Sequence, residues 1–237
     1  MARISRKELK TDEFATEVSK TYEFLQRHRE ALTRTGVVAG AILVVAAGFY
    51  FFLQHRRGQA EDELGHAIRV YYAPLAAESG PEQDLKFADE KARYQQAEKE
   101  FAAIADKYSW LRPGLIARYY LGLAKARLGK SQEAIRTLEA VAAKGDDRYS
   151  PLARFALAGL YTEMGKADQA QKIYRQLADQ PSPSVPKETA LLALAESLSQ
   201  SKPAEAQKIY QDIKKQAEKG SAAGELADQR LAELKKQ

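Results

Sequence analysis

The 237-residue chain contains no cysteine. That absence excludes disulfide scaffolds, thiol catalysis, cysteine-ligated zinc and iron–sulfur clusters. Eight prolines and 14 glycines are too few for a low-complexity or collagen-like chain, and a charged fraction of 29% excludes a polytopic membrane protein. The sequence also lacks GxSxG, Walker, dinucleotide-binding and HExxH motifs. We therefore expect a protein that is not an enzyme, has no catalytic residues and uses no cofactor.

Histidine is scarce as well, with three in the chain. His28 and His55 flank an apolar run on opposite sides and cannot meet. His66 lies four residues after Asp62 on an expected helix, where the pair could contact one metal ion. Two such ligands without a third are far more often a surface pair, so we predict no metal site.

One long segment lacks charge altogether: the run GVVAGAILVVAAGFYFFL at residues 36–53. A helix of that length spans about 27 Å, close to the hydrocarbon thickness of a bilayer. Residues 49–52 are all aromatic, as in the belts of membrane helices, and Arg34 and residues 55–57 border the run with cationic side chains. The pattern predicts a single transmembrane helix that contacts the lipid bilayer through residues 36–53.

Two other interpretations of this run are less consistent with the sequence. A buried core helix seldom lacks a polar stripe over its whole length. A cleaved signal peptide begins with a short cationic segment, whereas about 35 polar residues precede this run. No small-x-small cleavage site follows it, because the next residues are Gln54, His55, Arg56 and Arg57. We therefore interpret the run as an uncleaved signal anchor.

The charges around the anchor indicate its orientation. The first 35 residues contain eight Lys/Arg, the 20 residues before the anchor contain four, and the 20 after it contain three. Short tails follow the positive-inside rule, whereas long domains translocate largely regardless of their charge. This favours a cytoplasmic tail of residues 1–35 and a domain of residues 54–237 outside the cytoplasm. The reverse orientation stays open.

The tail is expected to contain one amphipathic helix. That helix either lies at the membrane interface and leads into the anchor, or docks on a membrane partner. Within the anchor, Gly36 and Gly40 are spaced for close helix contact, but one such pair does not decide whether the anchor dimerises. The tail residues that recur at helical spacing are Phe14, Val18, Tyr22 and Leu25.

Beyond residue 58 the sequence repeats with a period of 36 residues. The tetrapeptide QKIY occurs twice at this spacing, and a looser copy lies upstream, where Ala97 and Phe101 precede their counterparts by 37 residues. Periods of this size are typical of stacked supersecondary units. The matched positions are Ala134, Ala170 and Ala206; Leu138, Tyr174 and Tyr210; and Gly129, Gly165 and Ser201.

Each matched position has a structural explanation. Gly129 and Gly165 suit a left-handed turn between two antiparallel helices. The alanines suit close helix crossings, and the larger residue one turn later fills the space against the following unit. A helix pair cannot bury its apolar face alone, so stacking supplies the core. The sequence predicts an all-α fold: one transmembrane helix, then an α-solenoid of about four helix pairs, with residues 222–234 as a capping helix.

Two central units resemble the tetratricopeptide repeat, and the resemblance extends more loosely over about residues 58–220. The third unit departs from the motif at Leu194 and Ser201, and the first carries a loop around residues 78–86. The aromatic residue usual early in the first helix is missing, since Arg118, Arg154 and Ala190 occupy its position. The residues that carry the resemblance are Leu121, Gly122, Gly129, Ala134 and Leu138, and then Leu157, Ala158, Gly165, Ala170 and Tyr174.

The resemblance implies a concave groove, because the first helices of tetratricopeptide units line a surface that takes a segment of a partner. Tyr119 and Phe155 have an alternative role in packing between helices. Trp110, between two units, is expected to pack between repeats rather than to contact a ligand. The implied groove residues are Tyr119, Leu123, Arg127, Phe155, Thr162, Glu163, Leu191 and Leu198.

The order of tail, anchor and repeats resembles the YfgM-type ancillary translocon subunits of bacteria. That resemblance implies a single-pass protein of the bacterial inner membrane with a periplasmic repeat domain, whose partners are the Sec channel and a membrane-bound, chaperone-like foldase. It implies an adaptor that assists secretion or folding of translocated proteins. A cell-envelope assembly or division scaffold is the alternative function. An enzyme whose site leaves no motif, and a cytosolic receptor, are two others.

The net charge of +5 is concentrated near the anchor. Residues 1–57 contain ten Lys/Arg and six Asp/Glu, whereas residues 58–237 contain 27 and 26. Anionic lipid headgroups explain a basic excess at the borders of a membrane helix. We therefore expect no nucleic-acid partner.

Overall fold

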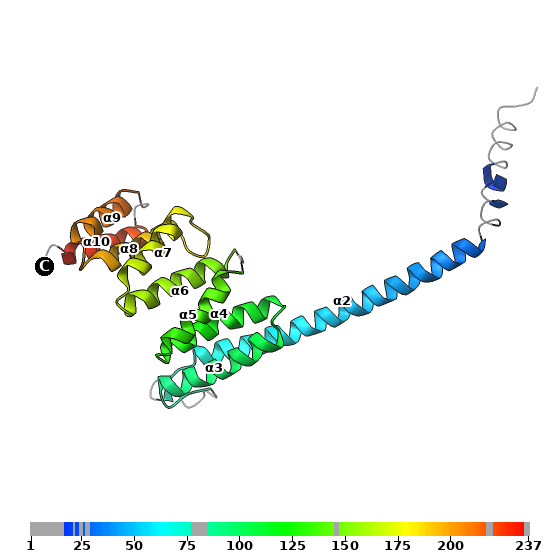
Figure 1. Ribbon diagram of the computed structural model, residues 1–237, viewed down its shortest axis with the longest axis horizontal. Coiled ribbons are helices and arrows are strands. Elements are labelled where there is room, and N and C mark those ends of the chain that lie inside the picture. The colour runs from blue at the N-terminus through cyan, green and yellow to red at the C-terminus, as the bar shows by residue number, and fades with distance from the viewer. Residues whose placement is uncertain are drawn as a thin grey trace, which may run out of the picture. The chain divides into compact units, whose positions relative to one another are not determined.

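A computed structural model describes residues 17–20, 22–23, 26, 29–76, 85–144, 147–216 and 220–234. Within these residues the elements are α-helices, apart from an isolated bridge between Leu75 and Phe87, and the all-α prediction is confirmed. The helices in Figure 1 are α2 (Arg29–Tyr71), α3 (Glu90–Lys107), α4 (Arg112–Arg127), α5 (Ser131–Ala142), α6 (Tyr149–Glu163), α7 (Ala167–Asp179), α8 (Lys187–Leu198), α9 (Pro203–Gln216) and α10 (Ala222–Leu234).

The chain forms two compact units, Met1–Arg56 and Arg57–Gln237. The first contains the apolar run, which lies on α2. Its most apolar stretch has a mean hydropathy of 2.3 and is 0% buried, and side chains such as Val44 and Phe51 are exposed. Among the described residues α2 alone is long and apolar enough to span a membrane.

The predicted amphipathic helix of the tail falls largely outside the described residues. Phe14 and Leu25 lie outside them, as does His28. Val18 and Tyr22 are described, and both side chains are exposed, at 51% and 64%.

The second unit begins with the later turns of α2, which pack against α3. Apolar residues of α2, including Leu64 and Val70, share a core with Phe101 of α3. The Tyr108 hydroxyl at the end of α3 donates to the Glu63 carboxylate of α2 at 2.9 Å. The Arg93 guanidinium donates to the carbonyl oxygen of Ala73 at 2.7 Å and fixes the chain that leaves α2. These contacts make α2 and α3 the first helix pair.

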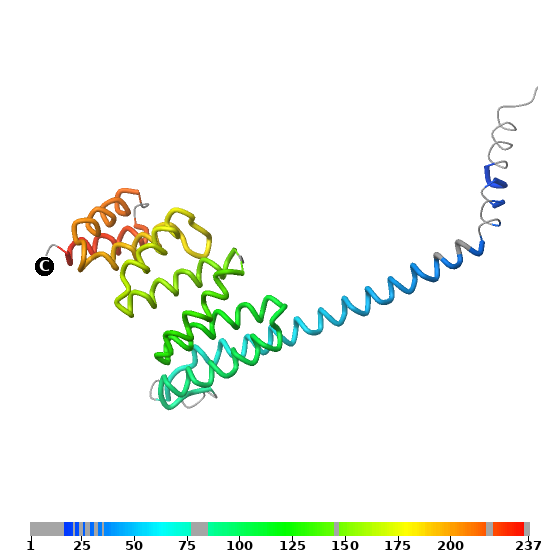
Figure 2. Tube along the Cα trace, viewed as in Figure 1, coloured from blue at the N-terminus to red at the C-terminus, as the bar shows by residue number. Residues whose placement is uncertain are grey.

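Helices α4 and α5, α6 and α7, and α8 and α9 form three further pairs, and α10 packs on α9. Each helix contacts the next one in the chain, and the trace reverses direction from one to the next (Figure 2). The first helices of neighbouring pairs also touch, α4 on α6. The predicted solenoid of four helix pairs with a capping helix is confirmed.

The turns inside the central pairs use glycine as predicted. Gly129 and Gly165 have positive φ angles of 73° and 72°, a region that residues with a Cβ atom rarely adopt. In both turns the next residue closes the helix: the Lys130 amide donates to Lys125 O at 2.9 Å, and the Lys166 amide to Tyr161 O at 2.8 Å. Described non-glycine residues have no positive φ, so the turn at Ser201 follows another path, and Pro203 starts the next helix.

The positions matched by the 36-residue period are buried, which confirms their structural interpretation. Each alanine of the series is 0% exposed, and the larger residue one turn later is at most 5% exposed. The looser upstream copy belongs to the same series, because Ala97 and Phe101 are also 0% exposed. These residues are Ala97, Ala134, Ala170 and Ala206, and Phe101, Leu138, Tyr174 and Tyr210.

The expectation that Trp110 packs between repeats is wrong. Its side chain is 56% exposed, in the turn between α3 and α4. The turn directs Tyr108 and Leu111 into the core instead, at 0% and 7% exposure. The amide of Leu111 donates to Tyr108 O at 2.9 Å, and this tight turn leaves the intervening tryptophan outside.

Two helical glycines allow a matched test of how tightly the first helices pack. A Cβ atom at Gly122 would lie 2.6 Å from Cγ of fully buried Leu138, whereas one at Gly159 would meet nothing nearer than the Tyr174 hydroxyl at 4.0 Å. Overpacking costs about 1–3 kcal/mol, more than the about 0.5–1 kcal/mol that alanine gains over glycine in a helix. We expect Gly122→Ala to lower the urea midpoint of the full chain in detergent, measured by circular dichroism, and Gly159→Ala to raise it. Equal shifts in one direction would contradict this packing.

Candidate partner-binding groove

A cavity of about 330 Å³ lies within the repeat unit, between α4 and α6. It opens where the first helices of two successive pairs face each other. Its lining is mainly apolar, with one cationic and one anionic side chain. The lining residues are Tyr71, Leu123, Ala126, Arg127, Leu138, Ala156, Gly159, Leu160 and Glu163.

Small residues create the space. Ala126 on α4 and Ala156 and Gly159 on α6 lie one turn from larger lining residues, at the helical spacing that places them on one face. Since glycine has no side chain and a Cβ at Gly159 would find open space, this position keeps the cavity unfilled. Leu138 of α5, which is fully buried, lines the inner side of the cavity.

The polar groups of the cavity are connected. The Arg127 guanidinium and the Tyr71 hydroxyl both line the cavity, and their hydrogen-bonding interaction raises the pKa of Arg127. Burial raises the pKa of Tyr71, and the hydrogen bond with Arg127 opposes that effect. The Glu163 carboxylate acts on Arg127 across the cavity and further favours its charged form. This cavity, called the groove from here on, thus combines the cationic Arg127 and the anionic Glu163 with an apolar lining.

Aromatic rings border the cavity on the α2 side. The Tyr71 ring lies 5.7 Å from the Tyr120 ring, and Tyr120 stacks on Phe101 at 5.3 Å. Tyr119 lies 5.4 Å from Tyr120 and 5.5 Å from Tyr149 of α6, centroid to centroid. Burial raises the pKa of Tyr119 to about 12 and raises that of Tyr120 further. This cluster joins α2, α3, α4 and α6 through ring contacts.

Comparison with known proteins agrees with this architecture. The tetratricopeptide repeat family model matches residues 117–144 and 152–182, which are the two central helix pairs. The chain contains tetratricopeptide repeats. Their fold generally serves as a non-catalytic scaffold for protein interaction.

Two solved structures have a similar fold. Both are crystal structures of kinesin light chain TPR-like repeats from Podosopora anserina, one of them a point variant. Each has a TM-score of 0.55 at 16% identity, covers 75% of this chain, and is itself covered over 85% or 86% of its length. At that identity the likeness shows the tetratricopeptide-like solenoid alone. No curated protein sequence matches the chain.

The structure brings three of the eight predicted groove residues together. Leu123, Arg127 and Glu163 line the cavity. The Thr162 side chain is exposed, and its hydroxyl donates back to Ala158 O of the same helix at 3.0 Å. Tyr119 packs in the aromatic cluster, against Tyr120 and Tyr149. The sequence had left open whether it packs between helices or faces the groove, and the structure shows it packing.

The remaining predicted groove residues belong to packing layers. Phe155 is half-buried and packs its ring 5.5 Å from that of Tyr174, and Leu191 is half-buried against the core. Leu198 offers no surface to a partner, because it is 0% exposed at the end of α8. The structure corrects its expected exposure: as the last residue of α8, it points into the core that α8 shares with α9 and α10.

The sequence prediction missed the small residues that line this cavity, and also Tyr71. It selected large and charged side chains, whereas the space depends on Ala126, Ala156 and Gly159. Helical spacing back from Glu163 would have found Gly159 and Ala156, four and seven residues upstream. No such signal points to Tyr71, because the long segment between the end of α2 at Tyr71 and the start of α3 at Glu90 interrupts the 36-residue register.

The acidic and histidine side chains near the start of the repeats form surface pairs. The His66 imidazole lies 3.6 Å from the Glu100 carboxylate of α3, and both side chains line one cavity together with Asp62 and Glu63. No group of three or more His, Asp or Glu suited to hold a metal is found among the described residues.

The raised pKa of Tyr119 predicts a loss of stability at alkaline pH. The folded state favours the neutral phenol, so its contribution is fully present below about pH 10 and is lost as pH rises toward about 12. One such group changes the unfolding free energy by at most about 1.4 kcal/mol per pH unit in that window. We expect Tyr119→Phe to flatten the decline of the urea midpoint above pH 10 without changing its shape below pH 9. Parallel profiles would contradict the assignment.

Proposed function

We propose that this protein is a membrane-anchored adaptor whose repeats bind a protein partner outside the cytoplasm. The observation that carries this proposal is the cavity between α4 and α6, on the face formed by the first helices of tetratricopeptide units. Its floor of Leu123, Leu138 and Leu160 suits an apolar side chain of a partner segment. Arg127 and Glu163 suit charges of opposite sign on either side of that side chain.

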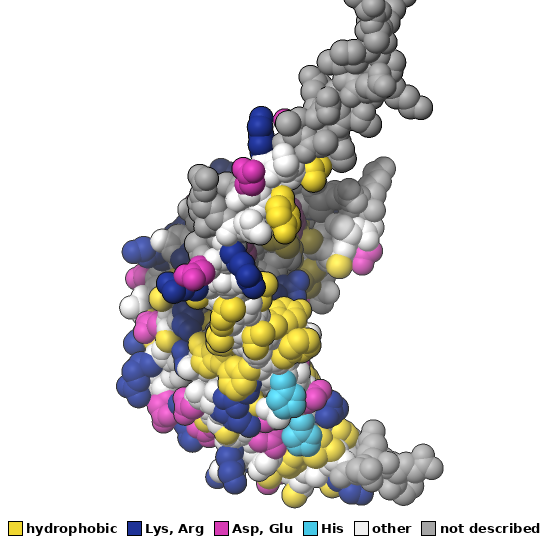
Figure 3. All heavy atoms as spheres, turned by 90° about the vertical axis from the view of Figure 1, so that its right-hand side faces the viewer, with side chains coloured by type: hydrophobic (Ala, Val, Ile, Leu, Met, Phe, Trp, Pro, Cys, Tyr) yellow, Lys and Arg dark blue, Asp and Glu magenta, His cyan; other side chains and the backbone are white. Residues whose placement is uncertain are grey.

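The surface of the repeats supports a protein partner over nucleic acid. Residues 58–237 contain almost equal numbers of basic and acidic residues, 27 and 26. Figure 3 shows Lys/Arg and Asp/Glu side chains interspersed on the face it displays, rather than gathered into a basic stripe. Nucleic-acid binding depends on such a stripe.

Membrane attachment is the second part of the proposal. Residues 36–53 form the anchor, residues 1–35 the cytoplasmic tail, and residues 54–237 the extracytoplasmic repeat domain. The exposed apolar side chains of α2, with none of the most apolar stretch buried, support this assignment, since a bilayer would cover them. Anchoring confines the groove near membrane partners and raises their effective concentration.

The process that this adaptor serves is proposed to be secretion or folding of translocated proteins in the bacterial inner membrane. Its support is the order of tail, anchor and short repeat array, which resembles the ancillary subunits of the Sec translocon. The expected partners are the Sec channel and a periplasmic foldase. Loss of the protein should then produce secretion stress, whereas an envelope or division scaffold would produce cell chaining.

Filling the groove tests whether it binds a partner. Gly159→Leu extends a side chain into the open space, whereas Gly159→Ala adds a single methyl group at the same position. We expect Gly159→Leu in the full chain to reduce recovery of the Sec channel by about tenfold when it is purified from detergent extracts. Gly159→Ala is the control and should recover as much as the unmodified chain. Equal recovery with all three proteins would show that partners bind elsewhere, for instance through the anchor.

Protease accessibility tests the proposed orientation. In intact cells whose outer membrane is permeabilised, we expect added protease to degrade residues 58–237 and leave a fragment that contains the tail and the anchor. Immunoblotting with tags at the two ends distinguishes the fragments. Protection of the C-terminal tag until the inner membrane is lysed would place the repeats in the cytoplasm.

A further inference from the structure

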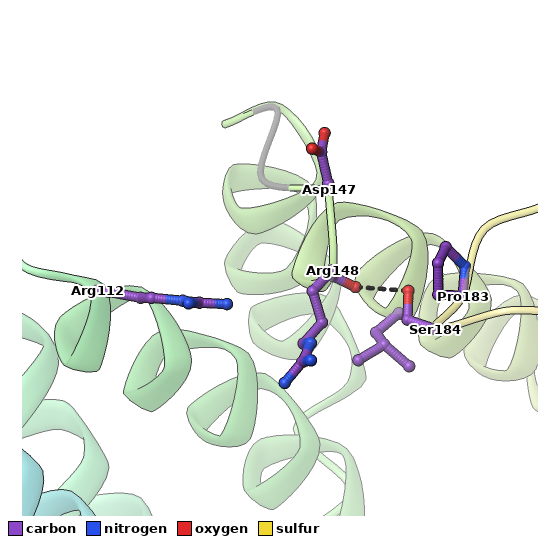
Figure 4. A pocket seen from close by; sticks show the side chains of 6 residues that line it. Arg112, Asp147, Arg148, Pro183 and Ser184 are labelled. Carbon is purple, nitrogen blue, oxygen red and sulfur yellow. Dashed lines mark hydrogen bonds between the residues drawn. The ribbon is translucent and has the colours of Figure 1, made fainter.

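A second and larger cavity, of about 760 Å³, lies along a different edge of the repeats (Figure 4). Three segments line it: the start of α4, the start of α6, and the loop before α8. It shares no lining residue with the groove between α4 and α6. Its lining residues are Arg112, Asp147, Arg148, Leu152, Pro183 and Ser184.

Hydrogen bonds fix the loop that forms one wall. The Ser184 hydroxyl donates to Arg148 O at 2.9 Å, which ties the loop to the start of α6. The Val185 amide donates to the Ser182 hydroxyl at 3.1 Å, and the Ser182 amide donates to Val185 O at 3.1 Å. Val185 itself is buried, at 2% exposure. The wall is therefore anchored both by hydrogen bonds and by an apolar side chain in the core.

Two guanidinium groups enter the space from different helices. Arg112 is the first residue of α4, and its side chain extends toward α6; the Arg148 side chain extends from the residue that precedes α6 (Figure 4). The Asp147 carboxylate points away from both guanidinium groups (Figure 4). Both helices start here, and their N-terminal ends add partial positive charge. Among the described lining residues, the two cationic side chains therefore point away from the carboxylate of Asp147.

We propose that this cavity binds an acidic segment of a protein partner. Arginine forks pair with carboxylates through two parallel hydrogen bonds, so Arg112 and Arg148 each suit an Asp or Glu side chain. Leu152 and Pro183 give the segment an apolar wall, and Asp147 accepts hydrogen bonds from its backbone amides. The cavity volume is in the range that encloses several groups of a ligand rather than a single small ion.

The same lining disfavours a phosphate or a nucleic acid. Asp147 repels a dense negative charge, whereas separate carboxylates can face the arginines and leave Asp147 to amide donors. The repeats also lack the basic excess that a polyanion needs, because residues 58–237 contain 27 basic and 26 acidic residues. The cavity is therefore a recognition site additional to the groove, and it does not depend on what the groove binds.

A peptide array tests this site with the full chain in neutral detergent. We expect the bound peptides to be enriched in Asp and Glu, and replacement of those residues by Asn and Gln to abolish binding. The double variant R112A/R148A should bind the tightest acidic peptide about tenfold more weakly, as expected for the loss of charge-assisted hydrogen bonds. Arg136→Ala, which removes another exposed arginine, on α5, should leave that affinity unchanged.

Three controls make the outcome decisive. Circular dichroism should show that R112A/R148A folds normally, since both side chains are exposed. Absence of acidic enrichment, or acidic binding that survives R112A/R148A, would overturn the proposal. Acidic binding lost in Gly159→Leu but kept in R112A/R148A would assign the peptides to the groove instead. Inorganic phosphate or short-chain phosphatidylglycerol that binds with the same dependence on the two arginines, and displaces the peptides at low concentration, would identify a phosphate site.

Discussion

The close approach of successive helices is the constraint on which the repeat domain depends, and small residues at the contacts make it possible. Ala97, Ala134, Ala170 and Ala206 are fully buried, and Gly122 faces Leu138 at a distance that leaves no room for a methyl group. Because one helix pair cannot enclose a core, each contact transmits its geometry to the next pair. The larger residue one turn after each alanine then fills the layer between neighbours. The solenoid is the result of repeating this arrangement.

The same constraint creates the surfaces available to partners. Where α4 and α6 meet, Ala126, Ala156 and Gly159 supply room that the core does not fill, and the groove lies there. Where α4 and α6 begin, the loop before α8 folds back on Arg148 and encloses the second cavity. The aromatic cluster around Tyr119 and Tyr120 connects the first three pairs beside the groove. Packing and recognition are therefore carried by neighbouring residues on the same helices.

The two cavities differ in their electrostatics. In the groove, Arg127 is held by Tyr71 and faced by Glu163, so both charges are partly satisfied within the protein. In the second cavity, two arginine side chains from different helices enter one space, and the carboxylate of Asp147 points away from both. The first arrangement suits an apolar side chain flanked by opposite charges, and the second suits carboxylates. A nearly neutral domain can thus offer two chemically distinct surfaces.

The sequence by itself determined the helical class, the four pairs with their cap, the glycine turns and the buried alanine series. All of these depend on local spacing, which a 36-residue period reveals. It also isolated the apolar run at residues 36–53, since composition and length suffice for that. Only the tertiary structure decided which side chains face a cavity. Leu198 is buried where exposure was expected, and Trp110 is exposed where burial was expected. Helix ends and tight turns set the direction of these two side chains. Tyr71, Arg112 and Arg148 acquired their neighbours from other pairs, at contacts that no sequence period encodes.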